Sequence, residues 1–113
     1  MSRSESERLD DMREECDRIG RLVARGRAAF DGDEAVRLAV ERSLEIIGEA
    51  ANMIGDETRG RHSDVDWRRI TRFRIVLAHH YHRVDPDQVW TIAVDHVPAL
   101  AKALGPLDRP ETG

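Results

Sequence analysis

Apolar residues recur at steps of three and four along the first half of this 113-residue chain, which is the spacing of one face of an α-helix. The first stripe, which predicts a helix over residues 5–28, comprises Leu9, Met12, Cys16, Ile19 and Val23. The second, which predicts a helix after a turn at residues 30–33, comprises Val36, Val40, Leu44, Ile47, Ala51 and Ile54. Gly55 is expected to cap this helix, and residues 55–63 are expected to form a polar loop.

Two further helices are predicted in the second half. Asp64 or Asp66 can cap a helix that begins near Trp67 and ends by about Arg83. The core face of this helix is expected to contain Ile70, Phe73, Val76 and Leu77. The last helix has Asp85 as N-cap, Pro86 at its first position, a kink or split at Pro98, and a stop at Gly105-Pro106.

No alternating pattern typical of strands occurs in the sequence. We therefore predict an all-α fold, a small up-and-down bundle of four main helices. The helical domain is expected to cover residues 1–105, followed by a flexible tail over residues 106–113. A chain of this length buries a modest core, so a partner subunit could add stability.

Composition excludes several classes of protein. Cys16 is the only cysteine, which excludes an internal disulfide framework. No apolar run reaches the length of a membrane span, and the first residues are polar and acidic, unlike a signal peptide. We therefore expect a cytoplasmic protein without membrane contact.

Charge is unevenly distributed along the chain. The formal net charge of −4 argues against general coating of nucleic acid. Residues 1–58 contain 15 acidic residues and nine arginines, whereas residues 59–83 contain seven arginines and four histidines but only two aspartates. This locally basic segment favours a focused anionic ligand over an extended duplex.

The basic segment contains three side chains suited to phosphodiester chemistry, Arg74, His79 and Tyr81. Arginine stays charged and can hold two phosphate oxygens at once. Histidine can give or take a proton near neutral pH. The three are framed by Trp67-Arg-Arg-Ile and by Val84-Asp-Pro-Asp-Gln-Val-Trp.

This framed pattern resembles the signature of the HepT-like ribonuclease toxins of the HEPN superfamily, which reads Arg-Asn, three apolar or small residues, His, any residue, Tyr. Arg74, His79 and Tyr81 match it, and residues 42–51 resemble the second helix of that family. Ile75 stands where the family has Asn. It could mark a weakened member, a position where polarity is not needed, or a substitution introduced to make a toxic protein expressible.

The resemblance implies the toxin half of a bacterial toxin–antitoxin pair, a homodimeric endoribonuclease that needs no metal or cofactor. Its substrate would be RNA, and the family suggests transfer RNA. The resemblance also implies a minimal nucleotidyltransferase antitoxin as partner, which would transfer adenylyl groups onto Tyr81.

On an ideal helix Arg74 and His79 point about 140° apart, whereas Tyr81 returns to within about 20° of Arg74. Either the last turn of the helix is distorted, or a second copy of the chain supplies the missing group. A twofold dimer would place two His79 and two Arg74 side chains around one cleft. The two histidines could then act as acid and base, while Arg74 stabilises the phosphorane.

Glu45 and Glu49 lie four residues apart, with Arg42 just before them. They could be solvated surface charges, or they could orient Arg74 or His79.

Other interpretations remain open. A zinc site at His79, His80 and His82 is disfavoured, because adjacent helical histidines diverge, no cysteine lies nearby and only Asp85 offers a fourth ligand. Trp67 and Trp90 are interpreted as core or interface anchors. The alternative functions are a non-catalytic module that docks a nucleotidyltransferase and holds nucleotide phosphates with Arg72, Arg74 and His79, and a purely structural helical dimer.

Overall fold

The computed structural model describes residues 3–78 and 84–107. Within these ranges it contains helices and no strand, which confirms the all-α bundle. The elements, in chain order, are α1 (Glu5–Val23), α2 (Arg27–Gly32), α3 (Glu34–Asn52), α4 (Asp56–Arg61), α5 (Trp67–Ala78), α6 (Pro86–Thr91), a π-helical turn (Ile92–His96) and α7 (Val97–Leu104).

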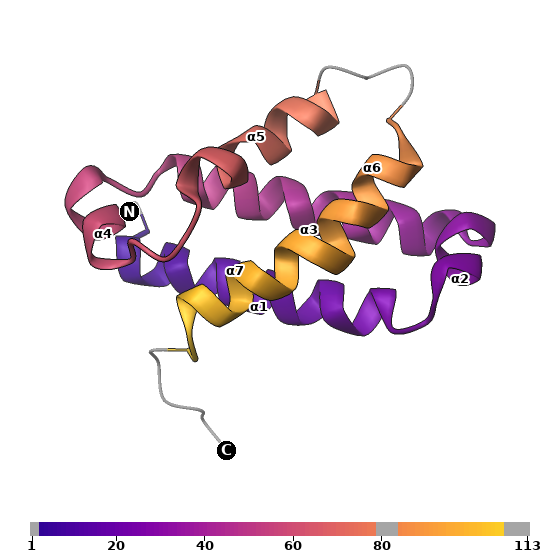
Figure 1. The fold of residues 1–113 in the computed structure, drawn as a ribbon, viewed down its shortest axis with the longest axis horizontal. Helices are drawn as coiled ribbons and strands as arrows, with labels where there is room; N and C mark the ends of the chain where they lie inside the picture. The colour runs from indigo at the N-terminus through magenta and orange to yellow at the C-terminus, as the bar shows by residue number, and fades with distance from the viewer. Residues whose placement is uncertain (1–2, 79–83, 108–113) are drawn as a thin grey trace.

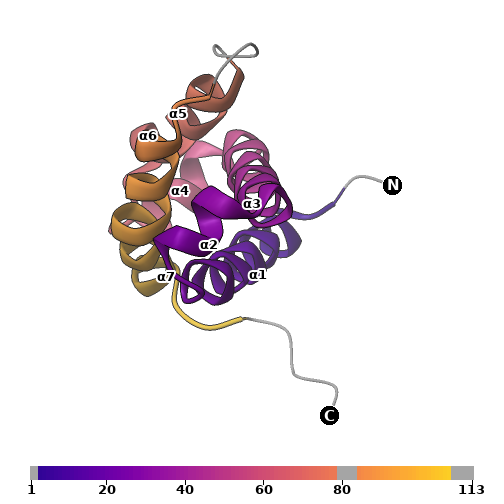
Figure 2. The same cartoon turned by 90° about the vertical axis from the view of Figure 1, so that its right-hand side faces the viewer.

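The long helices α1 and α3 lie side by side and form the base of the bundle (Figures 1 and 2). Helix α5 packs along α3, whereas α7 and the π-helical turn before it pack on α1. Both predicted apolar stripes face this core, with Met12, Ile19, Leu44 and Ile47 fully buried. The predicted core face of α5 is also confirmed, since Ile70 and Phe73 are buried and Val76 and Leu77 pack against the core.

The predicted first helix proved too long. It ends at Val23, and a short separate helix, α2, occupies residues 27–32, where a turn was expected. Gly26 is the reason, because its φ of 92° lies in the left-handed region that interrupts a right-handed helix. Helix α2 then brings Phe30 into the core with 0% exposure, and Asp33 caps α3 through the amide of Ala35.

The prediction of Gly55 as a C-cap and of a polar loop over residues 55–63 was wrong. Met53 ends α3, and Gly55 is extended (φ −79°, ψ 168°) as the N-cap of the short helix α4. The carboxylate of Glu5 accepts a hydrogen bond from the Gly55 N–H at 3.3 Å. Hydrogen bonds from Thr58 and Gly55 lower the pKa of Glu5, and the contact joins the start of α1 to α4.

The last helix is interrupted close to Pro98, as predicted, but the distortion lies just upstream. Residues Ile92–His96 form a π-helical turn, in which the Val97 N–H donates to the carbonyl of Ile92. Pro98 has no N–H, and its ring would clash with the carbonyl four residues earlier in a regular helix, so a wider turn relieves the conflict. The predicted N-cap is confirmed, since Asp85 accepts from the Asp87 N–H at 3.0 Å.

A buried arginine joins the first helix of the chain, α1, to the last helix, α7. The guanidinium of Arg13 donates to the carbonyl of Leu104 at 2.8 Å and 3.3 Å and pairs with Asp10 at 3.0 Å. These bonds satisfy a carbonyl at the end of α7 that has no partner within its own helix. The predicted tail is described only as far as Leu107, so its boundary stays a prediction. None of the described helices is long and apolar enough to cross a membrane.

Candidate active site

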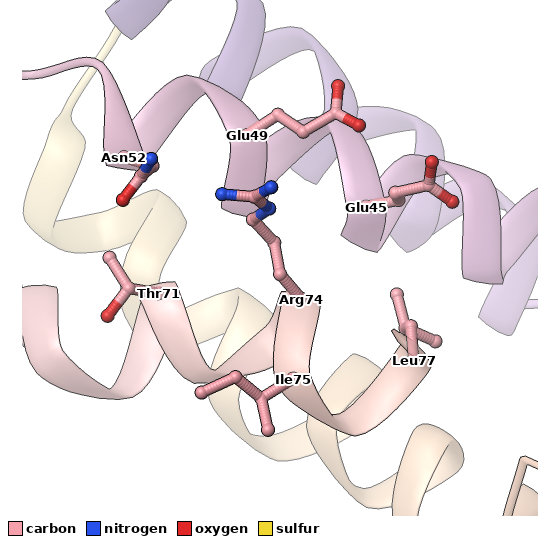
Figure 3. A pocket seen from close by; sticks show the side chains of 7 residues that line it. All are labelled: Glu45, Glu49, Asn52, Thr71, Arg74, Ile75 and Leu77. Carbon is pink, nitrogen blue, oxygen red and sulfur yellow. The ribbon is translucent and has the colours of Figure 1, made fainter. Parts of the chain in front are cut away.

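Helices α3 and α5 line an open pocket of about 760 Å³ (Figure 3). Three of its lining residues come from α3 and four from α5: Glu45, Glu49, Asn52, Thr71, Arg74, Ile75 and Leu77. Four residues singled out in the sequence, namely Arg74, Ile75, Glu45 and Glu49, therefore share one pocket. Both helices also contribute to one hydrophobic core, α3 with Ile47 and Ala51 and α5 with Ile70 and Phe73.

Arg74 extends from α5 toward α3, and its guanidinium lies between Glu49 and Asn52 (Figure 3). The stem of the side chain crosses α3 at Gly48, where an added Cβ would overlap it. Arg74 is exposed, and it forms no ion pair with a carboxylate among the residues that the structure describes. A guanidinium in this position is available to an anionic ligand.

The two carboxylates of the pocket are held by a different arginine. Arg42, three residues before Glu45 on α3, donates to the Glu45 carboxylate at 2.8 Å and lies 3.9 Å from the Glu49 carboxylate. All three side chains are about half exposed. Arg42 thereby offsets acidic charge that would otherwise compete with a phosphate for Arg74. An orienting role of Glu45 or Glu49 toward Arg74 or His79 stays a prediction.

Ile75 forms part of the apolar wall of the pocket together with Leu77. Its side chain is 53% exposed, which is unusual for an isoleucine of this fold. Ile75 therefore contributes little to the core, and a polar side chain would fit at this position without being buried.

Sequence reasoning missed two polar residues of the pocket, Asn52 and Thr71. Helical spacing could have found them, because Asn52 follows Glu49 by three residues and Thr71 precedes Arg74 by three. The Thr71 hydroxyl donates to the carbonyl of Arg68 at 3.0 Å, which leaves its oxygen as an acceptor. Arg72, named in the alternative function, is exposed and does not line the pocket.

His79 and Tyr81 lie outside the described residues, as do His80 and His82 of the zinc interpretation. Within residues 3–78 and 84–107, no group of three or more potential metal ligands occurs. The catalytic role of His79 and the modification of Tyr81 therefore stay predictions.

The two tryptophans act as anchors of the core, as interpreted from the sequence. The Trp67 indole N–H donates to the carbonyl of His62 at 3.1 Å, and its ring packs against the core under Arg59. Trp90 lies 5.2 Å from the ring of Phe30, which joins α6 to α2.

Comparison with known proteins relates the chain to ribonucleases. The chain matches the family described as "Ribonuclease HepT-like" over residues 12–107. It is 32% identical over 103 residues to the "Probable ribonuclease HepT" of Thermococcus cleftensis, covering 88% of this chain and 92% of that protein. It is 35% identical over 95 residues to a protein of Caldanaerobacter subterraneus subsp. tengcongensis named "Putative RNase TTE0752". This match covers 83% of this chain and 85% of that protein.

A third relative is the "Putative RNase MJ1380" of Methanocaldococcus jannaschii. It is 36% identical over 73 residues, which cover 65% of this chain and 67% of that protein. No solved structure gives a significant match. The extent of these matches confirms the resemblance and the prediction of an endoribonuclease. The chain belongs to the HepT-like ribonuclease family.

Proposed function

We propose that this ribonuclease is the toxin of a bacterial toxin–antitoxin pair and that it cleaves RNA, with transfer RNA as the first target to test, without a metal ion. The observation that carries the proposal is the position of Arg74, exposed in the pocket between α3 and α5 and in no ion pair among the described residues. A fixed cation of this kind can stabilise the charge that develops on a phosphate during cleavage.

The proposed reaction begins with attack of a ribose 2′-oxygen on the adjacent phosphorus. A base removes the 2′-hydroxyl proton, and an acid protonates the departing 5′-oxygen. His79 and its copy in a second protomer take these two roles, while Arg74 holds the non-bridging oxygens of the phosphorane. The products carry a 2′,3′-cyclic phosphate and a 5′-hydroxyl. DNA is resistant because it lacks the nucleophile.

The proposed partner is a minimal nucleotidyltransferase antitoxin that transfers adenylyl groups onto Tyr81. On a continued helix, Tyr81 would lie on nearly the same side as Arg74. A phosphodiester on its phenol adds negative charge next to Arg74 and mimics the substrate backbone. Modification would therefore silence the enzyme both by charge and by occupation of the site.

The test is cleavage of RNA by the purified chain in the presence of a metal chelator. We expect Arg74→Ala and His79→Ala to lower kcat by about 100- to 1000-fold, the usual cost of removing a group that stabilises the transition state. His80→Ala is the matched control and should be mild. Cleavage that survives the Arg74→Ala change, or that disappears only together with the fold, would contradict the proposed role of this pocket.

A second candidate is a non-catalytic module that docks a nucleotidyltransferase and binds nucleotide phosphates. Ile75 favours it, because this side chain removes an amide that the family carries at the same position. One cleavage assay on the unchanged chain and on Ile75→Asn distinguishes the ribonuclease from the docking module. A docking module cleaves RNA in neither form.

A further inference from the structure

We propose that Gly48 is a positioning residue for Arg74. The absence of a side chain at position 48 lets the stem of Arg74 lie directly on α3, and this contact aims the guanidinium into the pocket. The inference rests on the proposed role of Arg74 in cleavage and adds a residue that never touches the RNA.

The contact is close. A Cβ built on Gly48 would lie 2.5 Å from Cγ, 3.4 Å from Cδ and 3.3 Å from the backbone N of Arg74. Carbon atoms in contact are normally about 3.5 to 4.0 Å apart. No other residue type than glycine therefore fits at position 48 while Arg74 keeps this conformation.

Backbone conformation does not explain the glycine. Gly48 is buried within the regular helix α3, and the described glycines with positive φ are Gly26 and Gly105. A glycine inside a helix lowers stability relative to alanine, so one in this place needs another reason. Gly20, inside α1, has nothing within 4 Å of an added Cβ. Space for Arg74 is the reason that the structure offers for Gly48.

The type of overlap predicts what a methyl group would do. The nearest atom, Cγ, moves when the side chain rotates about its first torsion, so the large overlap is relieved by a new conformation of Arg74. The 3.3 Å approach to its backbone N needs only a shift of a few tenths of an ångström between α3 and α5. Its guanidinium would then leave the place between Glu49 and Asn52 (Figure 3). A displacement of about 1 Å in a catalytic group can lower the rate by roughly 100-fold.

The first experiment measures RNA cleavage by Gly48→Ala, with Gly20→Ala as the matched control. We expect kcat of Gly48→Ala to fall by about 10- to 100-fold with little change in KM, because Arg74 acts on charge that appears in the transition state. Gly20→Ala makes the same chemical change in open space and should cleave like the unchanged protein.

The second experiment follows Arg74 itself by NMR. The Nε–Hε resonance of Arg74, assigned by its loss in Arg74→Ala, should move in Gly48→Ala and stay in place in Gly20→Ala. Thermal unfolding adds a double-mutant cycle. Gly48→Ala should cost less stability in an Arg74→Ala background, where Cγ and Cδ are gone.

These readouts separate the two claims. If Arg74→Ala cleaves RNA normally, the proposed function of the pocket fails, whereas the resonance and the thermal coupling still test the contact. If Arg74→Ala is inactive but Gly48→Ala cleaves normally, the positioning role of Gly48 is overturned. It is also overturned if Gly48→Ala is inactive while the Arg74 resonance and the thermal coupling show no change.

Discussion

Arg74 is available to a ligand because its neighbours are engaged elsewhere. The Glu45 and Glu49 carboxylates share its pocket but lie within 4 Å of Arg42. The motif in the sequence predicted the cation, and the spacing on α3 indicated the two acids. The contact at Gly48 could not be predicted from either, because it depends on how closely two helices distant in sequence approach.

At the scale of single residues, Ile75 gives the sharpest prediction. Ile75→Asn should raise the rate of RNA cleavage by about 10- to 1000-fold if the amide contacts the phosphate or the Arg74 guanidinium, which corresponds to roughly 1.4 to 4 kcal/mol. Fold and stability should be unaffected, because the side chain is 53% exposed. The measurement is initial cleavage rate together with thermal unfolding.

Leu38→Asn is the control for this change, because Leu38 is 51% exposed and does not line the pocket. It should leave the cleavage rate unchanged. Equal rates for the unchanged chain and for Ile75→Asn would show that the family's amide has no catalytic part here, so that Ile75 carries no functional information.

The buried thiol of Cys16 is expected to lower the stability of the protein at alkaline pH. Burial, with smaller effects from Asp17 and Glu15, raises the pKa of its thiol from 9.0 to about 12. The unfolded chain loses this proton at lower pH than the folded protein. The contribution of the protonated thiol to the free energy of unfolding is therefore complete below pH 9 and is lost as the pH rises toward 12.

The measurement is the unfolding free energy of the chain and of Cys16→Ala at pH 7 and pH 10.5. The advantage of the unchanged chain over the variant should shrink by about 2 kcal/mol at the higher pH, since one pH unit corresponds to about 1.36 kcal/mol. A constant difference would mean that the thiol ionises equally well in the folded protein.

At the scale of helices, length decided what the sequence could predict. The 19-residue helices α1 and α3 repeat their apolar stripe over several turns, so their existence and their buried face were predicted correctly. The six-residue helices α2 and α4 are too short for the pattern to recur, and both were missed. Helical spacing could have placed Asn52 on the face of Glu49 and Thr71 on the face of Arg74, but only the packing of α3 on α5 brings these two faces together in one pocket.

The join between α1 and α7 depends on a side chain that no pattern singled out. Arg13→Ala removes the bonds to the Leu104 carbonyl and the buried pair with Asp10. We expect the unfolding free energy to fall by about 3 kcal/mol, as for other buried charged hydrogen bonds. Arg37→Ala, which breaks a 4.0 Å pair with Glu41 nearer the surface, should cost less than about 1 kcal/mol. The measurement is urea unfolding of both variants. If Arg13→Ala and Arg37→Ala lowered the unfolding free energy by similar amounts, the buried contact would not be the more important one.

At the scale of the whole molecule, one protomer provides Arg74 in an open pocket, and on an ideal helix the five-residue spacing would point His79 about 140° away from Arg74. A twofold dimer with the C-terminal half of α5 at its interface would bring a second His79 to the same cleft. We therefore expect sedimentation to give a dimer at micromolar concentration. A monomer that still cleaves RNA would require a locally unwound helix instead.

Mixing two inactive variants tests whether the site is shared. Arg74→Ala and His79→Ala should each be inactive alone, but after mixing and exchange roughly half of the dimers contain one protomer of each kind. Such a dimer keeps one Arg74 and one His79 from different protomers. If one Arg74 and the His79 of the other protomer are enough, the mixture should cleave RNA faster than either variant, whereas the proposed acid and base roles, which use both histidines, predict no gain. If subunits exchange, as labelled protomers would reveal, yet no activity returns, then each Arg74 needs the His79 of its own chain or needs both histidines at once. Mixing His79→Ala with the unchanged chain separates these two outcomes, because that dimer keeps a single His79, in the same chain as one Arg74. The mixed dimer is active if each Arg74 needs only the His79 of its own chain and inactive if both histidines are needed at once.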